Sequence, residues 1–172
     1  MTRRCALPLI VATAVLASCG TAQHTTAPSA PPQAPSGFHS GDCNLVTDDE
    51  INAVAGLGVF TKVVVSNVGC FWQEKDMYGS IGAGMGITTW WYRGSALDIE
   101  RKLEGSVGRQ LVDLSLNGNS GFEASDPNTC SVYVAKGADV ITWSIQTLNP
   151  ATLPSLCTII RRLAQLSQDR VN

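Results

Sequence analysis

Histidine is nearly absent from this sequence, and its scarcity removes several kinds of catalytic site. The chain has only His24 and His39, and both lie in a stretch rich in proline, serine and threonine near the N-terminus. A domain that folds beyond this stretch has no imidazole for a Ser-His-Asp or Cys-His triad, or for most catalytic zinc sites. Cysteine pairs of the C-x-x-C type are also missing, so we expect no metal site.

Positive charge is also sparse. The chain has 12 Lys and Arg against 14 Asp and Glu, and no stretch gathers more than two cations. Nucleic-acid binding needs clustered cations that neutralise phosphates, so we expect no nucleic-acid partner. For the same reason the domain should not bind an anionic lipid surface electrostatically, and membrane attachment would need covalent acyl chains.

Long apolar runs are missing as well. The run from Ala6 to Ala17 is about a dozen residues long, whereas a membrane-spanning helix needs about 20. Arg3-Arg4 precede it and Leu16-Ala17-Ser18-Cys19 close it, a pattern typical of a lipoprotein export signal. We expect residues 1–18 to be a signal peptide and Cys19 to carry the lipid, which would anchor the protein at the extracytoplasmic face of the cell membrane. The alternative is an ordinary secretory peptide that has a cysteine near its cleavage site.

Residues 19–41 predict a tether. They are rich in Pro, Ala, Ser and Thr and contain no Asp, Glu, Lys or Arg. Such a segment buries too little apolar surface to offset the entropy lost on ordering, so we expect it to be disordered. Residues 42–172 are enough for a single domain.

Four cysteines lie within this domain, at Cys43, Cys70, Cys130 and Cys157. In an oxidising compartment they predict two disulfides, for which three connectivities exist. We favour Cys43–Cys70 and Cys130–Cys157, because each would join a helix end to a nearby strand within one half of the domain. Each of these two disulfides would close a span of 27 residues. A loop of that length destabilises the unfolded chain by about 3–4 kcal/mol in the entropy model.

Local patterns predict an α+β domain. Capping residues and apolar stripes indicate three helices, at residues 47–55, 95–105 and 153–167. β-Branched and alternating residues indicate six strands, at residues 59–66, 70–73, 81–92, 110–116, 131–135 and 139–147. The order α-β-β-β-α-β-β-β-α, with short links between strands, predicts an antiparallel sheet of about six strands with three helices packed on it.

The second predicted helix has a charged side. Ser95 is expected as its N-cap, and Leu97, Ile99 and Leu103 occupy apolar positions. The charged residues from Glu100 to Glu104 predict a solvent-exposed face.

The third predicted strand ends in a cluster of aromatic residues. On strand spacing, Trp91 shares a face with Ile87 and is expected in the core, whereas Trp90 and Tyr92 share the other face with a row of glycines. Trp, Tyr and Arg are enriched in binding hot spots, so Trp90, Tyr92 and Arg93 form a candidate binding surface. The alternative is that a helix covers Trp90 and Tyr92, with the glycines allowing its close approach.

The lipoprotein signal, the Pro/Ser/Thr-rich tail and a cysteine just before the first helix resemble small actinobacterial lipoproteins of the domain-of-unknown-function family numbered 3558. Further shared motifs are Val68-Gly69-Cys70-Phe71-Trp72, Trp91-Tyr92-Arg93-Gly94-Ser95, Glu100-Arg101-Lys102, the group Gly118, Ser120, Gly121 and Phe122, Trp143-Ser144, and Leu153-Pro154 before the last cysteine. The resemblance implies a location in the cell envelope and a shared fold, and it implies no activity.

Because no catalytic motif is recognisable, we expect a non-catalytic binding or accessory module without a cofactor, acting on an envelope protein, lipid or glycan. A carboxylate-dependent hydrolase of cell-wall glycans is one alternative, and it would need two carboxylates about 5–10 Å apart in a cleft. Others are a lipid-binding lipoprotein with a large apolar cavity, and a lipoprotein that stabilises a membrane complex. The candidate carboxylates are Glu74, Asp76, Asp98, Glu100, Asp113, Glu123, Asp126 and Asp139.

Overall fold

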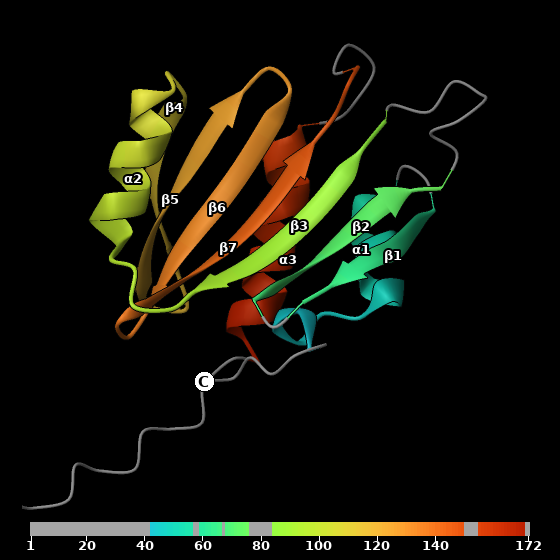
Figure 1. The fold of residues 1–172 in the computed structure, drawn as a ribbon, viewed down its shortest axis with the longest axis horizontal. Coiled ribbons are helices and arrows are strands. Elements are labelled where there is room, and N and C mark those ends of the chain that lie inside the picture. The colour runs from blue at the N-terminus through green and yellow to red at the C-terminus, as the bar shows by residue number, and fades with distance from the viewer. Residues whose placement is uncertain (1–41, 57–58, 67, 76–83, 150–154, 171–172) are drawn as a thin grey trace, which may run out of the picture. The chain divides into compact units, whose positions relative to one another are not determined.

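An antiparallel sheet of seven strands forms the centre of the domain in the computed structural model (Figure 1). The structure describes residues 42–56, 59–66, 68–75, 84–149 and 155–170. In spatial order the strands are β1 (Phe60–Val65), β2 (Gly69–Glu74), β3 (Gly86–Tyr92), β7 (Asp139–Gln146), β6 (Thr129–Lys136), β5 (Asn119–Asp126) and β4 (Gln110–Leu116). The helical elements are η1 (Cys43–Leu45), α1 (Asp48–Ala55), α2 (Leu97–Ser106) and α3 (Leu156–Gln168).

The sheet consists of two meanders, β1–β2–β3 and β4–β5–β6–β7, which join because β3 pairs with β7. Helix α2 connects the two meanders along the chain. Each disulfide lies within one half: Cys43 bonds to Cys70 and Cys130 to Cys157, with Cα–Cα distances of 5.3 and 5.2 Å. The predicted α+β class and the predicted cysteine pairing are confirmed.

The predicted strand count is one short, because the sequence patterns missed β5. Polar residues and glycine outnumber apolar ones in this strand, so it has no β signal of its own. It forms because Asn117 and Gly118, with φ of 50° and 77°, make a two-residue hairpin turn that returns the chain along β4. Pairing with β6 on its other side then buries Phe122 and Ala124.

Helices α1 and α3 cover one face of the sheet, with the main core beneath them (Figure 1). Helix α1 begins with the predicted capping box, in which the Thr47 and Glu50 side chains each accept the other residue's backbone N–H, and it ends at Gly56. Helix α3 buries an apolar stripe against β6 and β7, formed by Leu156, Ile159, Ile160, Leu163 and Ala164.

Several expectations lie outside the described residues. These are the signal peptide and tether with Cys19, the start of the strand predicted at 81–92, and the first residues of the helix predicted at 153–167. Among the residues that the structure describes, no helix combines the length and apolar composition needed to cross a membrane.

Helix α2 packs on the opposite face, against β4, β5 and β6, and its orientation differs from the prediction. Ile99 and Leu103 are 50% and 58% exposed, whereas Glu104 is turned toward the sheet. Its carboxylate accepts a hydrogen bond from the Tyr133 hydroxyl on β6 and one from Arg109 at 2.9 Å. The prediction of a solvated charged face is therefore wrong for Glu104, because Arg109, just before β4, and the Tyr133 hydroxyl on β6 bind it.

The start of α2 also differs from the prediction. Ala96 and not Ser95 is the N-cap, and the Ser95 hydroxyl instead donates to Glu100 at 2.5 Å. Arg101 reaches across to Asp113 on β4 at 2.6 Å. The helix is therefore attached to the sheet largely by polar contacts, and none of its residues is fully buried.

Candidate functional site

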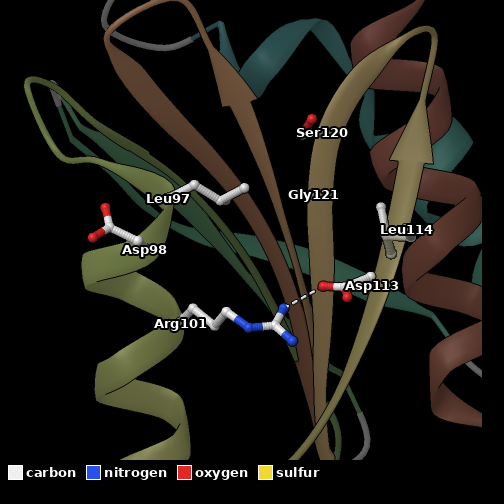
Figure 2. Close-up of a pocket in the computed structure, with 7 residues that line it drawn as sticks. All are labelled: Leu97, Asp98, Arg101, Asp113, Leu114, Ser120 and Gly121. Carbon is white, nitrogen blue, oxygen red and sulfur yellow. Dashed lines mark hydrogen bonds and ion pairs between the residues drawn. The ribbon is translucent and has the colours of Figure 1, made fainter.

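Two grooves open beside helix α2. The larger, about 620 Å³, lies between α2 and the β4–β5 hairpin, and we call it the α2–β4 groove (Figure 2). The smaller, about 410 Å³, lies between the start of α2 and the ends of β2 and β3. We call it the aromatic groove, and it is lined by Val68, Trp90, Trp91, Tyr92, Arg93, Ser95 and Glu100. It contains all three residues of the predicted binding surface.

The α2–β4 groove is crossed by an ion pair. Figure 2 shows Arg101 extending from α2 toward Asp113, and their N–O distance is 2.6 Å. The Arg101 guanidinium also lies 5.4 Å from the centre of the Phe122 ring. An exposed pair of this kind contributes less than about 1 kcal/mol. Two of the charged groups that line the groove therefore bind each other, and the third, Asp98, lies 3.6 Å from Lys102.

In the aromatic groove, the indole of Trp90 lies over Gly69, its partner in the β2–β3 ladder. A Cβ at Gly69 would be 2.5 Å from Trp90 Cε3 and 2.2 Å from the Thr89 carbonyl oxygen, so a residue larger than glycine does not fit. In the described part of the chain, the space beside Gly69 is filled by the Trp90 indole and not by a helix. Trp90 is half-buried and Tyr92 is 37% exposed, so both present surface to a ligand.

The connection between β3 and α2 is held by Asp139, at the start of β7. Its two carboxylate oxygens accept hydrogen bonds from Trp91 Nε1 at 2.8 Å and from the Gly94 N–H at 2.7 Å. Trp91 is buried, as predicted, and the Arg93 guanidinium stacks 5.3 Å from the centre of its ring. Sequence reasoning placed Asp139 only among the candidate carboxylates, because its partner Trp91 lies 48 residues away along the chain.

The surroundings of Tyr92 in the aromatic groove favour the neutral form of its side chain. Burial raises the pKa of Tyr92, and the nearby carboxylates of Glu100 and Glu104 raise it further. As in any tyrosine at neutral pH, the Tyr92 hydroxyl is protonated and can donate a hydrogen bond. Together with the Trp90 ring and the Arg93 cation, it gives the groove the side-chain types that dominate binding hot spots.

The carboxylates singled out from the sequence each have a donor close by, where the structure describes them. Glu74 accepts from the Met85 N–H at 3.1 Å, and Glu123 accepts from two nitrogens of Arg161 at 2.5 and 3.0 Å. The others are bound to cations, N–H groups or a hydroxyl, namely Asp98, Glu100, Asp113, Asp126 and Asp139. Asp76 lies outside the described residues. These carboxylates therefore have structural partners that account for their positions.

One group of metal-ligand side chains occurs in the described part of the chain. The ligand atoms of Glu123, Cys130 and Cys157 lie within 4.8 Å of one another. The two sulfurs are bonded to each other, and Glu123 is paired with Arg161. The group therefore offers no thiolate, so it lacks the ligands that a soft metal ion would need.

Together, the sheet, the two disulfides and the two surface grooves define a disulfide-bonded α+β domain that presents open surface grooves beside one helix. The chain belongs to the family described as "Protein of unknown function (DUF3558)", which it matches over residues 14–170. The family resemblance seen in the sequence is thereby confirmed.

Relatives of the chain occur in mycobacteria. It is 29% identical to a protein named "Putative lipoprotein LprB" of Mycobacterium leprae (strain TN) over 131 residues, 73% of this chain and 67% of that protein. It is 30% identical to the protein of the same name in Mycobacterium tuberculosis (strain ATCC 25618 / H37Rv) over 152 residues, 83% of this chain and 78% of that protein. No solved structure matches the chain.

Proposed function

We propose that the protein is a lipid-anchored, non-catalytic binding module of the cell envelope, and that its ligand docks in the aromatic groove. The observation that carries this proposal is the groove itself. Trp90 and Tyr92 present accessible ring surface beside Arg93, on a connection that Asp139 holds to the sheet. A site that is held in place before the ligand arrives loses less entropy on binding.

The anchor is inferred from two sources. The relatives are named as lipoproteins, and the Leu16–Cys19 motif follows a short apolar run in this chain. Cys19→Ala should release the protein into the medium or leave it unprocessed, as fractionation and immunoblotting would show. Membrane retention of this variant after a high-salt wash would contradict the lipid anchor.

Two features support a non-catalytic role. Residues 42–172 contain no histidine, and the four cysteines of the domain are paired in disulfides. The described candidate carboxylates are bound to donors within the fold, which accounts for them without a reaction. The protein would therefore act by holding a ligand or partner in the envelope, either a protein, a lipid or a glycan.

The test compares Trp90→Ala with a control on another surface. Lipid-free mature protein is immobilised and exposed separately to detergent-solubilised envelope proteins, envelope lipids and cell-wall glycan fragments. The wild type should retain one fraction, and Trp90→Ala should bind it at least tenfold less, because a hot-spot side chain contributes about 2 kcal/mol or more. Val112→Ala, on the exposed side of β4, should bind as the wild type does.

Folding has to be verified for both variants. Near-ultraviolet circular dichroism reports on the buried pair of Trp72 and Trp143, whose rings stack 5.9 Å apart. Retention of the ligand by a well-folded Trp90→Ala variant would refute the aromatic groove as the binding site.

A further inference from the structure

One half of the sheet has a face that no described helix covers. Helices α1 and α3 lie behind β1, β2 and β3 in Figure 1, whereas α2, on the other face, packs against β4, β5 and β6. An antiparallel sheet can leave one face to solvent when its other face is packed on the core. We call the uncovered part the open sheet face. Its partly or fully exposed side chains alternate along β2, β3 and β7, and they are Phe71, Gln73, Thr88, Trp90, Ser144 and Gln146.

Two aromatic rings of the open sheet face are packed on glycines of a neighbouring strand. The Trp90 indole of β3 lies over Gly69 of β2, and the Phe71 ring of β2 lies in the same way over Gly86 of β3. A Cβ at Gly86 would be 2.8 Å from Phe71 Cε2 and 3.2 Å from Cζ, so only glycine leaves room for this ring. Both aromatic residues are half-buried, and the remaining surface of each ring therefore faces the solvent.

The two rings are separated along the strand direction. In the β2–β3 ladder, Gly69 pairs with Trp90, and Gly86 pairs with Gln73, four residues further along β2. At about 3.4 Å per residue, the two glycines under the rings are about 14 Å apart along the strands. A ligand that contacts both rings must therefore be elongated.

The polar groups of the open sheet face are uncharged. Thr88 lies opposite Ser144 in the β3–β7 ladder, and Gln146 lies opposite Gly86. Hydroxyl and amide groups can both donate and accept hydrogen bonds. None of the described side chains that β2, β3 and β7 place on this face is ionisable below pH 9. A charged ligand would lose hydration there without gaining a counter-ion, so the face is suited to a neutral ligand.

We propose that the open sheet face binds a neutral oligosaccharide, whose sugar rings stack on Trp90 and Phe71 and whose hydroxyl groups bond to the polar side chains beside them. A pyranose ring carries C–H groups on its faces and hydroxyl groups around its edge. Its C–H hydrogens are attracted by the negative face of an aromatic ring. A lipid chain would instead leave the hydroxyl and amide groups of the face without partners, which is unfavourable.

This inference rests on the proposed function, because Trp90 belongs both to the aromatic groove and to the open sheet face. It names the class of ligand, and it extends the binding site along the sheet to Phe71, which is not among the residues that line the groove. Phe71 can therefore test the inference separately from the groove.

Tryptophan fluorescence of the mature protein, in micelles of a detergent without a sugar headgroup, measures binding. Cell-wall polysaccharide freed of protein and lipid is cleaved to oligosaccharides and separated by anion exchange into a neutral and an anionic fraction. Of the four tryptophans, Trp72, Trp91 and Trp143 are at most 3% exposed, so collisional quenching by acrylamide reports chiefly on Trp90. The neutral fraction should protect Trp90 from the quencher in a saturable way, and the anionic fraction should not.

Variants of Phe71 test the second ring while Trp90 remains as the reporter. Phe71→Ala should bind the neutral fraction about tenfold more weakly or worse, the loss expected for a hot-spot side chain. Phe71→Tyr keeps an aromatic ring and should bind as the wild type does, as should Val112→Ala on β4. Thr88→Val removes a hydroxyl and preserves the shape of the side chain, and it should weaken binding about two- to tenfold. Near-ultraviolet circular dichroism verifies the fold of each variant.

The outcomes distinguish this inference from the proposed function. Absence of protection by the neutral fraction would overturn the inference, and so would equal affinity of the wild type, Phe71→Ala and Thr88→Val for that fraction. Capture of an envelope lipid or protein in place of the neutral fraction would also overturn it. In each of these cases the proposed function would stand if Trp90→Ala lost the ligand that the wild type retains, and it would fall if Trp90→Ala retained that ligand.

Discussion

The two faces of the sheet are covered by helices that are attached in different ways. Helix α3 buries five apolar residues against β6 and β7, and its Cys157 is bonded to Cys130 on β6. Helix α2 has no fully buried residue and is attached through Glu104, Arg101 and their partners on the sheet. The α3 face therefore provides most of the stability, whereas the α2 face keeps both grooves open to solvent.

The residues that stabilise the fold and the residues that line the grooves therefore lie mostly on different faces of the sheet. Apolar burial stabilises the fold by about 25 cal/mol per Å², and the main cluster lies on the α1 and α3 side. On the other side, the smaller cluster of Phe122, Ala124, Tyr133 and Val140 packs against Leu97 at the start of α2. The exposed residues of the aromatic groove, such as Tyr92 and Arg93, can thus change with little effect on the core, whereas Trp91 belongs to it.

The largest expected effect comes from breaking the apolar face. Leu163→Ala removes a fully buried side chain from α3 and should lower the free energy of unfolding by about 2–5 kcal/mol. Leu103→Ala, on the exposed side of α2, should change it by less than about 0.5 kcal/mol. Urea denaturation of the two variants measures the difference, and equal losses would contradict the contrast between the faces.

A smaller effect is expected from the polar attachment of α2. Tyr133→Phe removes the hydroxyl that donates to Glu104 and should cost about 1–2 kcal/mol. Burial and the Glu104 carboxylate raise the pKa of Tyr133 well above its usual value of 10.0. Above pH 10 the unfolded chain ionises this tyrosine while the folded domain does not, so wild-type stability should fall as the pH rises beyond that value.

The control for this prediction is Tyr92→Phe, because Tyr92 is far more exposed. Unfolding curves between neutral pH and pH 11 should show a shallower alkaline loss of stability for Tyr133→Phe than for Tyr92→Phe. The same slope in both variants would show that Tyr133 is not the group responsible.

The smallest effect concerns a polar contact at the edge of the apolar face. Arg170, just beyond α3, donates to both carboxylate oxygens of Glu50 in α1, and this pairing, together with the Thr47 N–H, lowers the pKa of Glu50 from 4.5 to about 2. The lowered pKa stabilises the fold fully above pH 4.5, and that contribution is lost as the pH falls toward 2. Because the carboxylate is partly exposed, the contribution should be modest.

Glu50→Gln should remove this part of the acid dependence while keeping a capping residue at the same position. Thermal unfolding of the wild type and the variant between pH 2 and 5 checks it. Asp49→Asn, in the same turn of α1, should retain the wild-type slope, and an unchanged slope in Glu50→Gln would show that another carboxylate controls it.

Local chemistry in the sequence was enough to predict several elements. The capping box at Thr47 and Glu50 depends on two residues three positions apart, and the stripe of α3 repeats with the helical period, so both signals lie within a short window. The burial of Trp91 followed from strand alternation. The family and the cysteine pairing were also predicted correctly.

Contacts between distant segments decided the remaining features. Strand β5 forms because two neighbouring strands pair with its polar sequence, and α2 turns Glu104 inward because Arg109 and Tyr133 bind it. The Trp90 indole rests on a glycine of another strand, and Asp139 holds the groove from 45 to 48 residues away. The sequence by itself determined the elements whose signals are local. Only the tertiary structure decided the aromatic groove, because the contacts that form it join residues that lie far apart in the sequence and meet only on folding.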